Sequence, residues 1–175
     1  MKIKVLGFLL LVLSFAACDG PQTHHHHDNT PAHGNHPAMY ATLFVQQAAE
    51  YKALCYQAFN IATERLDARL QIPTDNLLAI VVDIDETVLD NSPYQAQGIL
   101  DHFDYPERWD EWINAAKADT VPGALHFLKY ASEKGVAVFY ISNRREKFRE
   151  ATLQNLKKYG FPGVRSFQTS LPARS

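Results

Sequence analysis

Apolar residues between positions 37 and 70 recur three and four positions apart and form one continuous stripe. This period is typical of an amphipathic helix, so the pattern predicts a single long helix over about 37–70. Cys55 falls on the stripe and is expected to fill the core rather than to act as a reactive thiol. The stripe consists of Phe44, Ala48, Tyr51, Cys55, Phe59, Ala62, Leu66 and Leu70.

Two continuous apolar runs follow, Ala79–Val82 and residues 136–141, and they predict parallel strands that are buried on both faces. Helical patterns cover about 106–118, 121–134 and 146–159, with Gly135 and Gly160 as helix stops. Strand, helical crossover and strand form the parallel unit of α/β folds. Residues after Phe167 show little pattern, and no element is predicted there.

Polar residues follow each predicted strand directly. Asp83 and Asp85 come after the first strand, where open parallel sheets bind their ligands. Their spacing would point both carboxylates toward one substrate, and two such charges repel unless they share a cation or a proton. Ser142 and Asn143 end the second strand and suit a phosphoryl oxygen, although a plain helix cap is the alternative. An exposed acidic loop is the alternative at Asp83.

The run Asp83-Ile-Asp85-Glu-Thr87 matches the DxDxT signature of the haloacid dehalogenase (HAD) superfamily. With its extension through Asp90-Asn-Ser-Pro-Tyr94, it resembles the class C acid phosphatases, which are bacterial lipoproteins that include the lipoprotein e type 5′-nucleotidases. The resemblance covers about residues 40–161. It implies an α/β, HAD-like (Rossmannoid) three-layer fold over residues 38–175, with a parallel central sheet, a long N-terminal helix and a small helical cap at 91–120.

The same resemblance implies a mechanism with Mg²⁺ as cofactor. Asp83 would be the nucleophile, Asp85 the general acid and base, and both would bind the metal. Thr87 would support the aspartate loop, and Ser142 and Asn143 would hold the phosphoryl group. The implied substrates are phosphomonoesters, in particular nucleotides. Tyr94 and Trp109 would wall a pocket that stacks a flat base, although aromatic residues in this pattern also commonly form core.

The N-terminal region predicts export. Residues 1–17 combine Lys2 and Lys4 with a short apolar run, as in a signal peptide, and Cys18 follows in a context that resembles a lipobox. Cys18 would then carry the lipid that anchors the protein in the bacterial cell envelope, at the outer membrane. An ordinary cleaved signal peptide is the alternative. Residues 18–37 are His-rich and are predicted to form a disordered tether, with weak metal binding by His24, His25, His26 and His27 as the alternative.

The composition limits the kinds of molecule that the protein is expected to bind. The formal net charge is −2 with balanced acids and bases, which argues against nucleic-acid binding. The 175 residues, 46% of them hydrophobic, suit one domain with a sizeable core. The oligomeric state stays open, and an oligomer is compatible with the sequence.

The family pattern also needs a downstream lysine and an acidic pair, and neither follows Arg165. Lys147, Lys157 and Lys158 are expected on a solvated helix. We therefore expect the C-terminal part of the domain to be missing. The alternatives are an inactive truncated family member, a metal- or haem-binding envelope lipoprotein, and a phosphotransferase that passes phosphate to an alcohol.

Overall fold

The computed structural model describes residues 36–164 and 167–171. The predicted signal peptide, Cys18 and His24 to His27 lie outside the described residues. His36, at the end of the predicted tether, accepts the Ala38 N–H and lies 3.3 Å from Asp104. No helix in the described part of the chain is both long and apolar enough to cross a membrane.

The predicted single N-terminal helix is wrong, because the structure has two helices, α1 (Met39–Gln47) and α2 (Ala49–Leu70). The break lies at Ala48, whose ψ of 128° is extended, while its N–H still caps α1 by donating to the Phe44 carbonyl. On α2 the predicted stripe packs as expected. Leu66 is buried, and Cys55, a free thiol, lies half-buried against the core.

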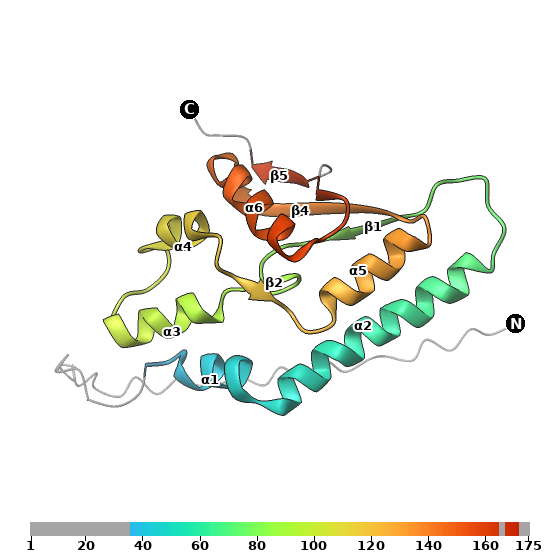
Figure 1. The fold of residues 1–175 in the computed structure, drawn as a ribbon. Helices are drawn as coiled ribbons and strands as arrows, with labels where there is room; N and C mark the ends of the chain where they lie inside the picture. The colour runs from blue at the N-terminus through green and yellow to red at the C-terminus, as the bar shows by residue number, and fades with distance from the viewer. Residues whose placement is uncertain (1–35, 165–166, 172–175) are drawn as a thin grey trace, which may run out of the picture. The chain divides into compact units, whose positions relative to one another are not determined.

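A three-stranded parallel sheet in the order β1-β4-β5 packs against helices on one side (Figure 1). Its strands are β1 (Ala79–Val82), β4 (Ala137–Arg145) and β5 (Phe167–Leu171). The register pairs Ile80 with Val138 and Val81 with Phe139. The predicted α/β class with a parallel sheet is confirmed, whereas β5 was not predicted.

Helices cover one face of this sheet within the described residues. Val138 and Tyr140 are buried there, beneath α5 (Ala124–Glu133) and α6 (Arg149–Tyr159). The other face carries Val81, Phe139 and Ile141, which are 61%, 37% and 43% exposed. The prediction of strands buried on both faces is therefore wrong for the part of the chain described, and β4 alternates strictly between the two environments.

A short antiparallel ribbon holds the segment between β1 and α5. β2 (Leu89–Asp90) pairs with β3 (Asp119–Thr120), so the two ends of the intervening chain lie side by side. Between them lie α3 (Ser92–Asp101) and α4 (Trp109–Ala115), as Figure 1 shows. The predicted helix over 106–118 is shorter than expected, because Pro106 lies in the preceding turn and Ala116 ends the helix in a left-handed conformation. A 3₁₀ turn, η1 (Glu146–Phe148), precedes α6.

Candidate active site

The loop after β1, which contains the two predicted aspartates, turns tightly. The backbone N–H groups of Val88 and Leu89 both donate to the Ile84 carbonyl at 3.0 Å, and Thr87 donates its own N–H to the same oxygen at 3.3 Å. The strand ends at Val82, so the alternation assumed from the sequence does not continue through the loop. Asp83 is exposed, whereas Asp85 is half-buried, and no polar contact joins their carboxylates among the residues described.

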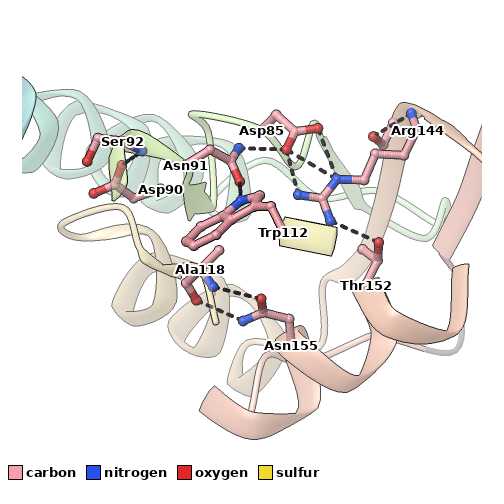
Figure 2. A network of polar contacts seen from close by, with 10 residues as sticks. Asp85, Asp90, Asn91, Ser92, Trp112, Ala118, Arg144, Thr152 and Asn155 are labelled. Carbon is pink, nitrogen blue, oxygen red and sulfur yellow. Dashed lines mark hydrogen bonds and ion pairs between the residues drawn. The ribbon is translucent and has the colours of Figure 1, made fainter. Parts of the chain in front are cut away.

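Asp85 is held by donors from two directions (Figure 2). Its Oδ1 accepts the Asn91 Nδ2 at 2.7 Å and the Arg144 Nη2 at 2.6 Å. Arg144 Nε lies 3.2 and 3.1 Å from the two carboxylate oxygens, so the guanidinium forms a forked pair. Trp112 Nε1 donates to Asn91 Oδ1 at 2.8 Å, which fixes the side-chain amide with its NH₂ group toward Asp85.

Arg144 reaches Asp85 because β4 is longer than predicted. The strand continues through Arg145, so Ser142 and Arg144 face the buried side while Asn143 faces the exposed side. On the buried side, Arg144 Nη1 donates to Thr152 Oγ1 on α6 at 2.9 Å. Ser142 Oγ accepts the Arg144 N–H at 3.1 Å. The two residues predicted to hold a phosphoryl group therefore point in opposite directions.

A pocket of about 650 Å³ opens beside this network, and we call it the Asp85 pocket. Its lining includes three cations, Arg144, Arg145 and Lys147, together with three carboxylates. Lys147 is exposed, as expected, and it pairs with the exposed Asp110 on α4, a contact that was not predicted. The complete lining is Asp85, Glu86, Gln95, Tyr105, Pro106, Trp109, Asp110, Asn143, Arg144, Arg145, Lys147 and Phe148. Asp83, Thr87 and Ser142 are not part of this lining.

The two predicted pocket aromatics differ in position. Trp109 lines the Asp85 pocket, and its ring lies 5.9 Å from the Arg144 guanidinium carbon. Tyr94 is buried, its hydroxyl donates to the Glu107 carbonyl at 2.7 Å, and its ring packs edge-on against Trp109. Tyr94 therefore lies in the core of segment 91–120, behind the pocket wall, as the alternative interpretation held.

Glu86 adds a further carboxyl at the edge of the Asp85 pocket, in a left-handed backbone conformation with φ of 55°. Much of Glu86 is exposed to solvent. Neighbouring protein groups nevertheless desolvate its carboxyl and raise the pKa of this group above the ordinary value. The charges of Asp85 and Asp90 raise the pKa further, while hydrogen bonds from Asn91 oppose the rise. Negative charge is thus concentrated around this loop.

The loop offers oxygen ligands for a metal ion. The described residues contain no group of three or more His, Cys, Asp or Glu side chains that would hold an ion by themselves. Mg²⁺, however, commonly binds one or two carboxylates and completes its shell with water and substrate phosphate. The exposed Asp83 carboxylate and the main-chain carbonyl of Asp85 fit that requirement in the type of donor.

A family model confirms the resemblance that the motif predicted. The model of the HAD superfamily, subfamily IIIB (Acid phosphatase), matches residues 14–171. The chain belongs to this acid phosphatase family.

Solved structures show which members of the family the chain resembles. The class C acid phosphatase from Bacillus anthracis, determined with tungstate bound, is 44% identical and superimposes with a TM-score of 0.75. The match covers 78% of this chain and 59% of that one, and a second structure of the same enzyme gives the same values. The predicted HAD-like fold and the likeness to class C acid phosphatases are both confirmed.

Curated plant proteins are more distant relatives. "Acid phosphatase 1" from Solanum lycopersicum is 32% identical over 83 residues, which cover 46% of this chain and 32% of that protein. "Vegetative storage protein 1" from Arabidopsis thaliana is 29% identical over 93 residues, covering 52% of this chain and 34% of that protein. The chain therefore spans about a third of the length of these curated relatives.

Proposed function

We propose that this chain carries the chemistry of a phosphomonoester hydrolase, with the substrate phosphate at the mouth of the Asp85 pocket, within reach of the exposed Asp83 carboxylate. The observation that supports this most directly is the fixed Asp85 carboxylate on the wall of a pocket lined by Arg144, Arg145 and Lys147. Preorganised cations stabilise the charge that develops on phosphoryl oxygens, and they do so without reorganising during the reaction. Family membership supplies the reaction class.

In the proposed first step, a carboxylate oxygen of Asp83 attacks phosphorus in line with the leaving oxygen. The bond from phosphorus to that oxygen breaks and an aspartyl phosphate forms, while Asp85, which carries a proton at the start of this step, gives that proton to the departing alcohol. In the second step, water attacks phosphorus, Asp85 takes the water proton, and inorganic phosphate leaves Asp83. Asn91 and Arg144 keep the Asp85 carboxyl directed toward the pocket during both steps.

The remaining predicted residues receive distinct proposed roles. Asn143 lines the Asp85 pocket and would contact the phosphoryl oxygens, whereas Ser142 would position Arg144 through the Arg144 N–H. Thr87 would brace the loop through its backbone bond to Ile84. Mg²⁺ would be held by the Asp83 carboxylate and the Asp85 main-chain carbonyl, and when bound it neutralises negative charge on the phosphoryl group.

The substrate class and the location of the protein in the cell are also proposals. We propose 5′-nucleotides as substrates, with Trp109 as the aromatic wall, since its ring lines the Asp85 pocket. We further propose lipidation at Cys18 and attachment to the cell envelope, supported by the apolar run that precedes this cysteine. Labelling cells with a radioactive fatty acid tests this attachment, because Cys18→Ser is expected to abolish incorporation.

Hydrolysis of p-nitrophenyl phosphate by the full chain, with Mg²⁺ and after chelation, tests the central proposal. Asp83→Asn should abolish turnover and the hydroxylamine-sensitive phosphoenzyme, because an amide is a far poorer nucleophile. Asp75→Asn, which changes an exposed carboxylate in the turn before β1, is the matched control and should leave the rate unchanged. Turnover that survives in Asp83→Asn, or no turnover in the unmodified chain, would overturn the proposal.

A further inference from the structure

Two polar residues lie on the buried face of α6, where an amphipathic helix is expected to carry apolar side chains. Thr152 and Asn155 are both buried, and their neighbour Leu156 belongs to the hydrophobic core. Residues three positions apart share one face of a helix, so the two side chains point in the same direction. Buried polar side chains are costly unless they are hydrogen-bonded, and each of these two has a specific partner.

Asn155 binds the chain that leads from α4 to β3. Its Oδ1 accepts the Ala118 N–H at 3.1 Å, and its Nδ2 donates to the Ala118 carbonyl at 2.8 Å. Ala118 is itself buried, so a single side-chain amide satisfies both main-chain polar groups of this residue. The amide thereby fixes segment 91–120, near its C-terminal end, to α6.

The contact between Asn155 and Ala118 closes a ring of contacts around the Asp85 carboxylate (Figure 2). On the α4 side of the ring, Trp112 orients the Asn91 amide that donates to Asp85. On the α6 side, a helix residue holds the guanidinium that pairs with the same carboxylate. The ring passes in order through Asp85, Asn91, Trp112, Ala118, Asn155, Thr152 and Arg144.

We propose that Asn155 is a positioning residue for the proton that Asp85 gives to the leaving group. By fixing the chain after α4 to the helix that holds Arg144, Asn155 keeps the two donors of Asp85 in one arrangement. Without Asn155 the two sides of the ring can shift relative to each other, and a small shift of a catalytic group costs much of its effect. The inference rests on the proposed function, because it concerns the step in which the phosphate is transferred to Asp83.

The chemistry of the leaving group separates this role from a purely structural one. In the first step the bond from phosphorus to the leaving oxygen breaks, the bond to Asp83 forms, and the Asp85 proton moves to the leaving oxygen. An alkoxide needs that proton, whereas p-nitrophenolate is a stable anion that departs without one. A misplaced Asp85 should therefore slow alkyl esters more than nitrophenyl esters. A variant that is merely less stable should slow both equally.

Two phosphomonoesters that differ by one methylene group test the proposal in the full chain with Mg²⁺. 4-Nitrobenzyl phosphate releases an alkoxide, and p-nitrophenyl phosphate releases a phenolate. In Asn155→Ala, kcat/KM should fall about tenfold for the benzyl ester and less than about twofold for the phenyl ester. The ratio kcat/KM is the suitable quantity because it excludes the later hydrolysis of the phosphoenzyme. Tyr140→Phe, which loses a hydrogen bond between β4 and Pro162, is the control and should affect the two esters equally.

The indole N–H of Trp112 tests the coupling without catalysis, since it donates to Asn91 on the other side of the ring. In the ¹⁵N-labelled full chain, this signal is assigned from its loss in Trp112→Phe. It should shift and exchange faster with solvent in Asn155→Ala, and Tyr140→Phe should leave it in place. Asn155→Ser keeps one hydroxyl near Ala118 and should give smaller changes of the same kind, so the test does not depend on the folding of the alanine variant.

Equal losses for the two esters in the Asn155 variants, or an unchanged Trp112 indole signal, would each overturn the proposal. If the unmodified chain hydrolyses neither ester, the proposed function fails. The indole signal then still decides whether Asn155 holds the two sides of the ring together.

Discussion

The carboxylate of Asp85 is positioned by residues far away in the sequence. Arg144 lies 59 positions downstream, and its own guanidinium is held from behind by Thr152. Asn91 lies only six positions away, but its amide is oriented by Trp112 from α4. The side chain of Arg144 is 3% exposed and that of Asp85 18%, so this ion pair is largely removed from water. Partners in such a site depend strongly on one another.

Replacing Arg144 with Met should destabilise the protein by about 3 kcal/mol, because it leaves a largely buried carboxylate without its cation. The double variant Arg144→Met with Asp85→Asn should lose less than the sum of the two single changes, since it removes the unpaired charge. Urea unfolding of all four proteins gives the coupling energy. Strictly additive losses would contradict the pairing seen here.

Trp112→Phe should keep the packing of the ring but remove the donor that orients Asn91. We expect a loss of about 1 kcal/mol in stability and a fall in kcat at nearly constant KM, because Asp85 loses its fixed direction. Trp109→Phe is a useful comparison, since Trp109 lines the Asp85 pocket and should affect KM instead. A Trp112→Phe enzyme that is altered only in KM would contradict the role assigned to Asn91.

The buried phenol of Tyr140 should make the stability of the fold decrease at alkaline pH. Burial raises the pKa of its phenol above the ordinary value, and its hydroxyl donates to the Pro162 carbonyl at 2.7 Å. The folded state therefore keeps a proton on this phenol that the unfolded chain releases at about pH 10. The contribution of the phenol to the free energy of unfolding is complete below that pH and is lost as the pH rises above it. Urea unfolding at neutral pH and above pH 10 should show this fall, and Tyr140→Phe should reduce it. Tyr105→Phe, at an exposed ring, should not.

The sequence predicted the acidic loop and the polar end of β4, because both follow from apolar runs that stop at chemically distinct residues. It gave no role to Asn91, Arg144 or Thr152, although Asn91 lies within the motif run of residues 83–94. Their roles depend on contacts between separate segments, which a local pattern does not encode. Lys147 is exposed as its helix periodicity suggested, but its pairing with Asp110 on α4 and its position at the Asp85 pocket also depend on a separate segment.

Helices and strands were predicted correctly where the local pattern of apolar residues determines them. They were missed where the conformation depends on pairing or packing with a distant segment. α5 and α6 follow the expected ranges because their apolar residues recur with a helical period and end at glycine. β5 has no distinctive pattern, and its conformation comes from parallel pairing with β4. The break at Ala48 was missed because the apolar stripe continues through it, although α1 and α2 pack on different neighbours.

The turn that leads from α6 toward β5 depends on Gly163. Its φ is +68°, and a Cβ there would lie 2.5 Å from the Val138 carbonyl oxygen on β4. Gly163→Ala should therefore cost about 3 kcal/mol or more, because both the backbone conformation and the close approach are lost. Gly135→Ala, also at positive φ but with open space around it, should cost only about 1 kcal/mol. Similar melting temperatures for the two variants would contradict this account.

At the scale of the whole molecule, the least expected feature among residues 36–164 and 167–171 is the sheet face that no helix covers. Val81 and Ile141 present apolar surface to solvent, beside Phe139 in the register. Contiguous apolar patches on a sheet favour association with other chains. The helices pack on the opposite face of the sheet and do not shield these side chains from solvent.

Replacing Val81 and Ile141 together by Thr should therefore reduce concentration-dependent association, while keeping β-branched side chains in the strands. Sedimentation velocity at rising concentration measures the change, and binding of a hydrophobic dye should fall in parallel. Leu54→Gln with Leu100→Gln, at exposed positions on two separate helices, is the control and should have little effect. Equal reductions in both variants would point to general surface hydrophobicity rather than to the sheet face.

The β2–β3 ribbon also bears on how relatives of this chain can diverge. Because Leu89 pairs with Thr120 and the Val121 N–H donates to the Val88 carbonyl, the intervening helices begin and end at neighbouring points. An insertion or deletion between those points that spares Asn91 and Trp112 leaves β1, the strand that ends just before Asp83, in its register. Ligand preference can therefore evolve by changes at Gln95, Tyr105 and Trp109, which line the Asp85 pocket, provided that Asn91 and Trp112 in the same segment are retained to orient Asp85.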